Sequence, residues 1–205
     1  MRERARDLLP QVLLTLQSLI QAIALEGLWS RVAEAPHLHA GGPAAWVGWL
    51  QVSAVVLGIL LVWLMYTSLV IRYLWTPTTR DSLFPFGIGL LEFAAIELLG
   101  PDHAAAWLLL MGAIYVLAIW SSFDMVERAN REAGLAPTRF VDRPGNRAAT
   151  AAVGVHFALA ALVAVVGGYG IVVGIAFAII ALLLLVQILT VRRLTRAMMR
   201  SSETE

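Results

Sequence analysis

Six apolar stretches follow one another along the chain, separated by polar segments or by segments that contain glycine and proline. A helix needs roughly 20 apolar residues to cross the hydrocarbon core of a bilayer. The stretches predict helices over about 8–29, 46–75, 83–99, 104–127, 148–166 and 171–190, of which the third barely spans. We therefore expect one all-α domain, residues 1–205, that forms a polytopic membrane protein with six transmembrane helices.

Composition supports this class and excludes several others. Hydrophobic residues make up 60% of the chain and charged residues 14%, whereas about a quarter of a soluble domain is charged. The absence of cysteine excludes disulfides, thiolate-bound metals and cysteine nucleophiles. All 15 basic residues are arginine, so a Schiff-base lysine is excluded as well. We expect no cofactor and no nucleic-acid partner.

The arginines predict the orientation. If both termini are cytoplasmic, six spans place 14 of the 15 arginines on the cytoplasmic side and only Arg31 outside. This asymmetry follows the positive-inside rule and predicts a multi-pass protein of the plasma membrane, the inner membrane in a bacterium. Tryptophans should then mark both interfaces: Trp29, Trp46, Trp49 and Trp107 at the outer one, Trp75 and Trp120 at the inner one.

The third stretch carries a carboxylate near mid-membrane. Glu92 lies in the middle of the predicted helix, where an ionisable side chain is costly and must face a partner, a cavity or water. His156 is the titratable group at similar depth in the fifth helix. If the two meet, burial and mutual attraction act on both, and a proton exchange in the physiological pH range is one outcome. A neutral hydrogen bond that joins the two helices is the other.

The first helix carries polar residues on one side. They are Gln11, Thr15, Gln17, Ser18 and Gln21. Spacings of three and four place most of them together, so we expect this side to avoid lipid. They either line an aqueous path, in which Gln17 and Gln21 are transport residues, or bind neighbouring helices.

Acidic and imidazole side chains gather at the predicted outer end. We name Glu26, Glu97, Asp102 and His103 as an outer vestibule that attracts cations. His37 and His39 lie nearby on a loop, but the spacing of these residues does not define a metal site. Asp102 has a simpler alternative role as the N-cap of the fourth helix.

Two further packing interactions are expected. Gly154 and Gly174 lie in series of small residues four apart, which predict a tight hairpin of the last two helices or an oligomer interface. Arg72 and Asp124, both near the inner interface, are expected to pair.

No enzyme motif is present: the chain has no zinc-protease motif, nucleophile elbow, phosphate loop or dinucleotide fingerprint. The layout is similar to that of the small bacterial relatives of lysosomal-type six-helix potassium channels. That family has Phe-Ser-Asp in its first helix where this chain reads Leu16-Gln17-Ser18-Leu19, so no residue roles are carried over.

The leading hypothesis is a small cation or proton channel or transporter, acting as a homo-oligomer in the lipid bilayer. The alternatives are a non-transporting membrane subunit or assembly factor that binds another protein, and a metal- or haem-dependent membrane enzyme that uses the four histidines.

Overall fold

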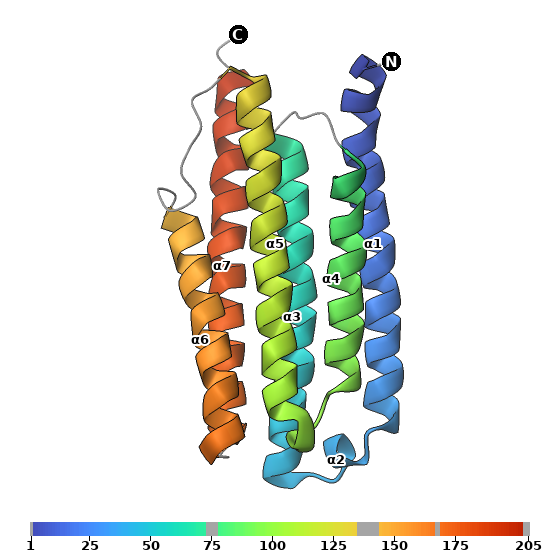
Figure 1. Cartoon of the computed structure of the whole chain (residues 1–205), viewed down its shortest axis with the longest axis vertical. Coiled ribbons are helices and arrows are strands. Elements are labelled where there is room, and N and C mark those ends of the chain that lie inside the picture. Colours follow the sequence, from blue (N-terminus) through green and yellow to red (C-terminus); the bar gives the residue numbers. More distant parts are fainter. Residues whose placement is uncertain (1, 73–77, 135–143, 167–168, 203–205) are drawn as a thin grey trace.

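The computed structural model is a bundle of long helices that run lengthwise beside one another (Figure 1). It describes residues 2–72, 78–134, 144–166 and 169–202. In that part of the chain the elements are α1 Arg2–Glu34, α2 Pro36–His39, α3 Gly42–Arg72, α4 Thr79–Glu97, the 3-10 turn η1 Pro101–His103, α5 Ala104–Glu132, α6 Pro144–Val166 and α7 Tyr169–Ser202. The prediction of an all-helical fold is confirmed for these residues, which form no strand.

Several helices extend beyond the apolar stretches that predicted them. α1 begins at Arg2, α5 continues to Glu132 and α7 continues to Ser202. Hydropathy marks where charges begin, but charged residues are good helix formers, so the backbone continues past that point. α4 begins earlier than predicted because Thr78 and Asp81 form a capping box at its N-terminus.

Two central helices organise the bundle. α3 packs chiefly against α7, and α5 packs chiefly against α6. α4 lies between α1 and α5, and α1 also contacts α3. The first residues of α1 and the last residues of α7 lie at the same end of the bundle (Figure 1).

Glycines let α4 approach its two neighbours closely. A Cβ atom on Gly89 would lie 2.2 Å from Ile20 Cγ2 on α1, and one on Gly87 would lie 2.9 Å from Leu117 on α5. Gly154 and Gly174 behave differently, because nothing described lies within 4 Å of a Cβ built on either. The prediction that they hold α6 and α7 in a tight hairpin is therefore wrong: each of these helices packs mainly on another helix.

Among the residues that the structure describes, three helical segments are long and apolar enough to cross a membrane: Leu8–Glu34, Gly42–Ile71 and Pro101–Glu132. Shorter apolar helices cover Val153–Val163 and Gly170–Leu183. Large apolar side chains also face outward from the bundle, as Leu90 does at 69% exposure. Water would disfavour such a surface and lipid would not, so both observations indicate a membrane protein.

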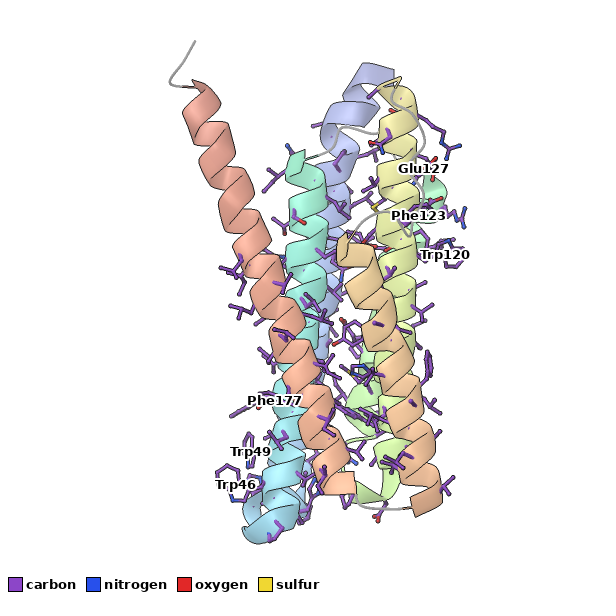
Figure 2. All side chains as sticks on the ribbon, turned by 90° about the vertical axis from the view of Figure 1, so that its left-hand side faces the viewer. Trp46, Trp49, Trp120, Phe123, Glu127 and Phe177 are labelled. Atoms are coloured by element: carbon purple, nitrogen blue, oxygen red, sulfur yellow. The ribbon has the colours of Figure 1, made fainter. Side chains whose placement is uncertain are left out.

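Three of the exposed tryptophans lie toward the two ends of the bundle. Trp46 and Trp49 project outward near the end where α3 begins, and Trp120 projects outward nearer the opposite end (Figure 2). Trp107 was predicted to join the first group, but it is fully buried. Its ring faces the core of the bundle, so that prediction is wrong. Trp75 lies outside the described residues.

A buried glutamine fixes the turn between α4 and α5. Gly100 N–H donates to Gln51 Oε1 over 3.0 Å, and Gln51 Nε2 donates back to Gly100 O over 3.4 Å. Gly100 has a φ of 132°, which a residue with a side chain rarely adopts. These bonds satisfy both ends of the Gln51 amide and hold the start of η1 against α3.

Candidate functional site

Polar side chains from four helices are buried in the interior of the bundle. We call them the polar cluster: Gln17 and Gln21 on α1, Glu92 on α4, Tyr115 on α5 and His156 on α6. All five are between 0% and 4% exposed. The four site residues predicted for the membrane interior, Glu92, His156, Gln17 and Gln21, are thus all placed in the core.

Glu92 lies at the centre of this cluster. Both of its carboxyl oxygens are buried, and neither has a hydrogen-bond partner among the residues that the structure describes. The Gln21 side chain lies close enough to interact with the carboxyl, although not in the geometry of a hydrogen bond. Gln21 Nε2 instead donates to the backbone oxygen of Ile59 on α3 over 3.1 Å. The carboxyl is therefore removed from water, and no hydrogen bond from the described residues replaces its hydration.

Tyr115 contacts His156. The rings of Tyr115 and His156 meet edge to face, with centroids 5.3 Å apart. The Tyr115 hydroxyl is buried and has no hydrogen-bond partner in the described part of the chain. Our sequence analysis did not name Tyr115 as a site residue. The available signal was a hydroxyl group in the middle of an apolar helix.

The polar side of α1 divides into two parts. Gln17 and Gln21 are buried, and neither the amide nitrogen nor the amide oxygen of Gln17 has a partner among the described residues. Gln11 and Thr15 are exposed, contrary to the expectation that the whole side avoids lipid. Thr15 satisfies its hydroxyl by donating to Gln11 O within the helix.

Ser18, the remaining member of that side, donates to Leu14 O and accepts a hydrogen bond from Trp63 Nε1 over 3.1 Å. This bond gives the indole nitrogen of Trp63, which is 37% exposed in the middle of α3, a polar partner.

The residues of the predicted outer vestibule are exposed. Glu26, Glu97, Asp102 and His103 all face outward, and no group of three or more acidic, histidine or cysteine side chains within the described ranges is arranged to hold a metal. The prediction that Asp102 caps the fourth helix is wrong. Asp102 lies inside η1, and the residue that precedes α5 is His103, which makes no side-chain cap.

The histidine loop is more ordered in structure than its sequence indicated. His37 and His39 lie in the short helix α2, whose Leu38 is buried against α3. His39 bonds to Val32 O over 3.0 Å, and Trp49 donates to Leu38 O. These contacts give α2 a packing role.

A second charged group, not predicted from sequence, joins α4 to α5. Asp81 is fully buried and accepts two hydrogen bonds from the Arg128 guanidinium, one of them 2.9 Å long. Arg128 also pairs with Asp124 over 3.1 Å, and Arg80 lies 3.8 Å from Asp124. Asp124 was expected to pair with Arg72, whose side chain lies outside the described part. Its described partners are on α4 and α5.

The sequence held a signal for this group in the order Thr78-Thr79-Arg80-Asp81, which is a capping box with aspartate in its last position. Its partner Arg128 lies 47 residues away, so local sequence did not indicate the pair.

Comparisons of the chain with protein-family models, with curated proteins and with solved structures find no match. The interpretation of the polar cluster therefore rests on its geometry and chemistry.

Proposed function

We propose that this chain is a six-span membrane protein that moves protons or small cations across the bilayer, with Glu92 as the exchange site. The observation that carries the proposal is the Glu92 carboxyl, which is buried in the bundle with neither oxygen hydrogen-bonded among the described residues. An ionised carboxylate in such a place is strongly disfavoured. It must take up a proton or a cation, and reversible uptake in mid-membrane is the central step of transport.

The surroundings of Glu92 favour transport over the alternative that Glu92 only joins two helices by a neutral hydrogen bond. A side chain with that structural role would have its polar atoms paired, as Gln51 has with Gly100. Gln17, Gln21 and Tyr115 instead each leave at least one buried polar atom without a partner within the described structure. Such groups usually mark a place where water or an ion binds.

The proposal includes the orientation and assembly expected from sequence. Both termini are cytoplasmic because 14 arginines then lie on that side, in accordance with the positive-inside rule. The acidic residues Glu26, Glu97 and Asp102 then lie on the outer side and attract cations. A homo-oligomer is included because the open space beside Gly154 and Gly174 suits a neighbouring helix.

Flux measurements on reconstituted protein test this function. Wild-type protein in liposomes should dissipate an imposed proton or cation gradient. Glu92→Gln keeps the shape of the side chain but cannot ionise, so we expect the rate to fall by about tenfold or more, equivalent to about 1.4 kcal/mol in the barrier. Glu132→Gln is the matched control, since it makes the same change at an exposed position of α5, outside the polar cluster and the predicted vestibule.

The control should leave the flux unchanged. Equal rates in Glu92→Gln and wild type, for every ion tested and across pH, would contradict the proposed role of Glu92. Absence of flux in the wild type would favour the alternative of a non-transporting membrane subunit.

A further inference from the structure

Arg80 presents a positive charge at the surface of the bundle. Its side chain is 53% exposed, and the closest carboxylate oxygen among the described residues, Oδ1 of Asp124, lies 3.8 Å away. That distance is longer than a hydrogen bond. Asp124 is instead bound by Arg128 over 3.1 Å, and Arg128 also binds the fully buried Asp81. Arg128 thus engages both carboxylates on the inner side of this group, whereas the Arg80 guanidinium lies on the outer side.

Two aromatic rings hold the Arg80 guanidinium in place. Its central carbon lies 5.1 Å from the centroid of the Trp120 ring and 5.9 Å from that of the Phe84 ring. The two rings pack edge to face on each other, with centroids 5.7 Å apart. Cation–π contacts use the charge of the guanidinium and not its N–H groups. The arginine is therefore positioned by its neighbours, and its donors are available to an acceptor from outside the chain.

The surface next to Arg80 changes from polar to apolar. Leu83, one turn further along α4, is 64% exposed, and Val116, one turn before Trp120 on α5, is 44% exposed. Trp120 is half exposed and projects outward (Figure 2). An exposed tryptophan between a charged and an apolar surface is typical of the level of the lipid headgroups. A molecule that covers this surface must carry a negatively charged acceptor next to an apolar chain.

We propose that Arg80, Trp120 and Leu83 bind one anionic phospholipid, with its phosphate on the Arg80 guanidinium and an acyl chain along Leu83 and Trp120. The planar guanidinium can donate two parallel hydrogen bonds to the oxygens of a phosphate. A headgroup with net negative charge is favoured, because cationic side chains near the membrane surface attract anionic lipids. This inference goes beyond the proposed transport function and does not depend on it.

Thermal unfolding in mixed micelles tests the inference. Wild-type protein in a non-ionic detergent is titrated at constant ionic strength with phosphatidylglycerol, or with phosphatidylcholine that has the same acyl chains. We expect a saturable rise in melting temperature with phosphatidylglycerol, because a ligand that binds the folded state stabilises it. Phosphatidylcholine and inorganic phosphate should each give a much smaller rise. Arg80→Gln should increase the concentration of phosphatidylglycerol at half-saturation by about fivefold.

Arg131→Gln is the matched control for Arg80→Gln. Arg131 is exposed in the last turn of α5, and its described side-chain hydrogen bond goes to Glu127 O in the same helix. The control removes the same charge from the surface, so the half-saturation concentration should not change. Trp120→Leu keeps an apolar side chain but removes the ring beneath Arg80, so it should weaken binding in the same direction as Arg80→Gln.

Three outcomes would overturn the inference. Equal shifts in Arg80→Gln and Arg131→Gln would show a diffuse attraction of anionic lipid and no site at Arg80. Equal rises with phosphatidylglycerol and phosphatidylcholine would contradict the preference for a negative headgroup. A rise with inorganic phosphate as large as that with phosphatidylglycerol would assign the site to a free anion and not to a lipid.

Discussion

Two buried glutamines show how the same side chain serves different purposes in this bundle. Gln51 on α3 pairs both ends of its amide with the backbone of Gly100 and fixes a turn. Gln17 on α1 is equally buried, and both ends of its amide lack a partner among the described residues. A buried amide without partners costs free energy. Gln17 therefore contributes to the stability of the fold only if its amide has a partner beyond the described residues.

Asp81 is expected to be the most important charged residue for stability. Its side chain is 0% exposed, and that of its partner Arg128 is 17% exposed. Asp81→Asn keeps an oxygen for the helix cap but leaves the guanidinium without its main counter-charge. Removing one partner of a buried pair costs about 3 kcal/mol. We expect this loss in the free energy of unfolding, measured by denaturing-detergent titration of the purified protein.

Arg80→Gln is the comparison for this variant. Arg80 is 53% exposed, lies 3.8 Å from Asp124 and covers the ring of Trp120. Its loss should cost about 1 kcal/mol or less. Similar stabilities for Asp81→Asn and wild type would show that the Arg128 pair contributes nothing.

At the scale of the helices, sequence predicted what depends on local information. The apolar stretches located the long helices. The choice of helix partners was not predicted, because it depends on residues far apart in the chain. Small residues four apart on α6 and α7 indicated a hairpin or an oligomer interface, yet within the chain α6 packs mainly on α5 and α7 mainly on α3.

The candidate site was predictable to a similar extent. Apolar flanks predicted that Glu92 and His156 are enclosed by the bundle, and both side chains are buried. The contact of Tyr115 with His156 and the pair of Asp81 with Arg128 were not predicted, because both depend on how α4, α5 and α6 rotate about their axes. Hydropathy alone does not fix that rotation.

The contact between α1 and α4 yields a prediction for helix packing. Gly89→Ala would place a Cβ atom 2.2 Å from Cγ2 of Ile20, a short β-branched side chain with little room to move. Overpacking of this kind costs about 1–3 kcal/mol. Thermal unfolding in detergent should therefore show a lower melting temperature for Gly89→Ala.

Gly27→Ala is the matched control, since a Cβ atom on this glycine of α1 meets open space and alanine is the better helix former. Its melting temperature should be equal to or higher than that of wild type. The opposite order of the two variants would mean that α1 and α4 are not in contact at Gly89.

At the scale of the whole molecule, the Asp81 group stabilises the bundle, whereas the polar cluster contains the proposed transport site. The Asp81–Arg128 pair closes α4 onto α5 near the start of α4, and the Gln51–Gly100 bonds close the turn at its other end. Between these two ends lies Glu92, whose carboxyl oxygens have no hydrogen-bond partner among the described residues. Side-chain interactions therefore hold both ends of α4, and the carboxyl in its middle is free to bind the proton or cation that the proposed transport function requires.

The proposed orientation makes a prediction that the absence of cysteine renders easy to test. Single cysteines can be introduced with no native thiol to react. Ala40 follows α2 and Ala133 follows α5, and both are exposed at opposite ends of the bundle. The positive-inside distribution places Ala40 outside and Ala133 inside. In intact cells, a membrane-impermeant maleimide should label Ala40→Cys readily, whereas Ala133→Cys should react only after permeabilisation. Labelling of both cysteines at equal rates in intact cells, or labelling of Ala133→Cys alone, would contradict the six-span arrangement with cytoplasmic termini. The acidic residues Glu26, Glu97 and Asp102 would then no longer be assigned to the outer side of the membrane.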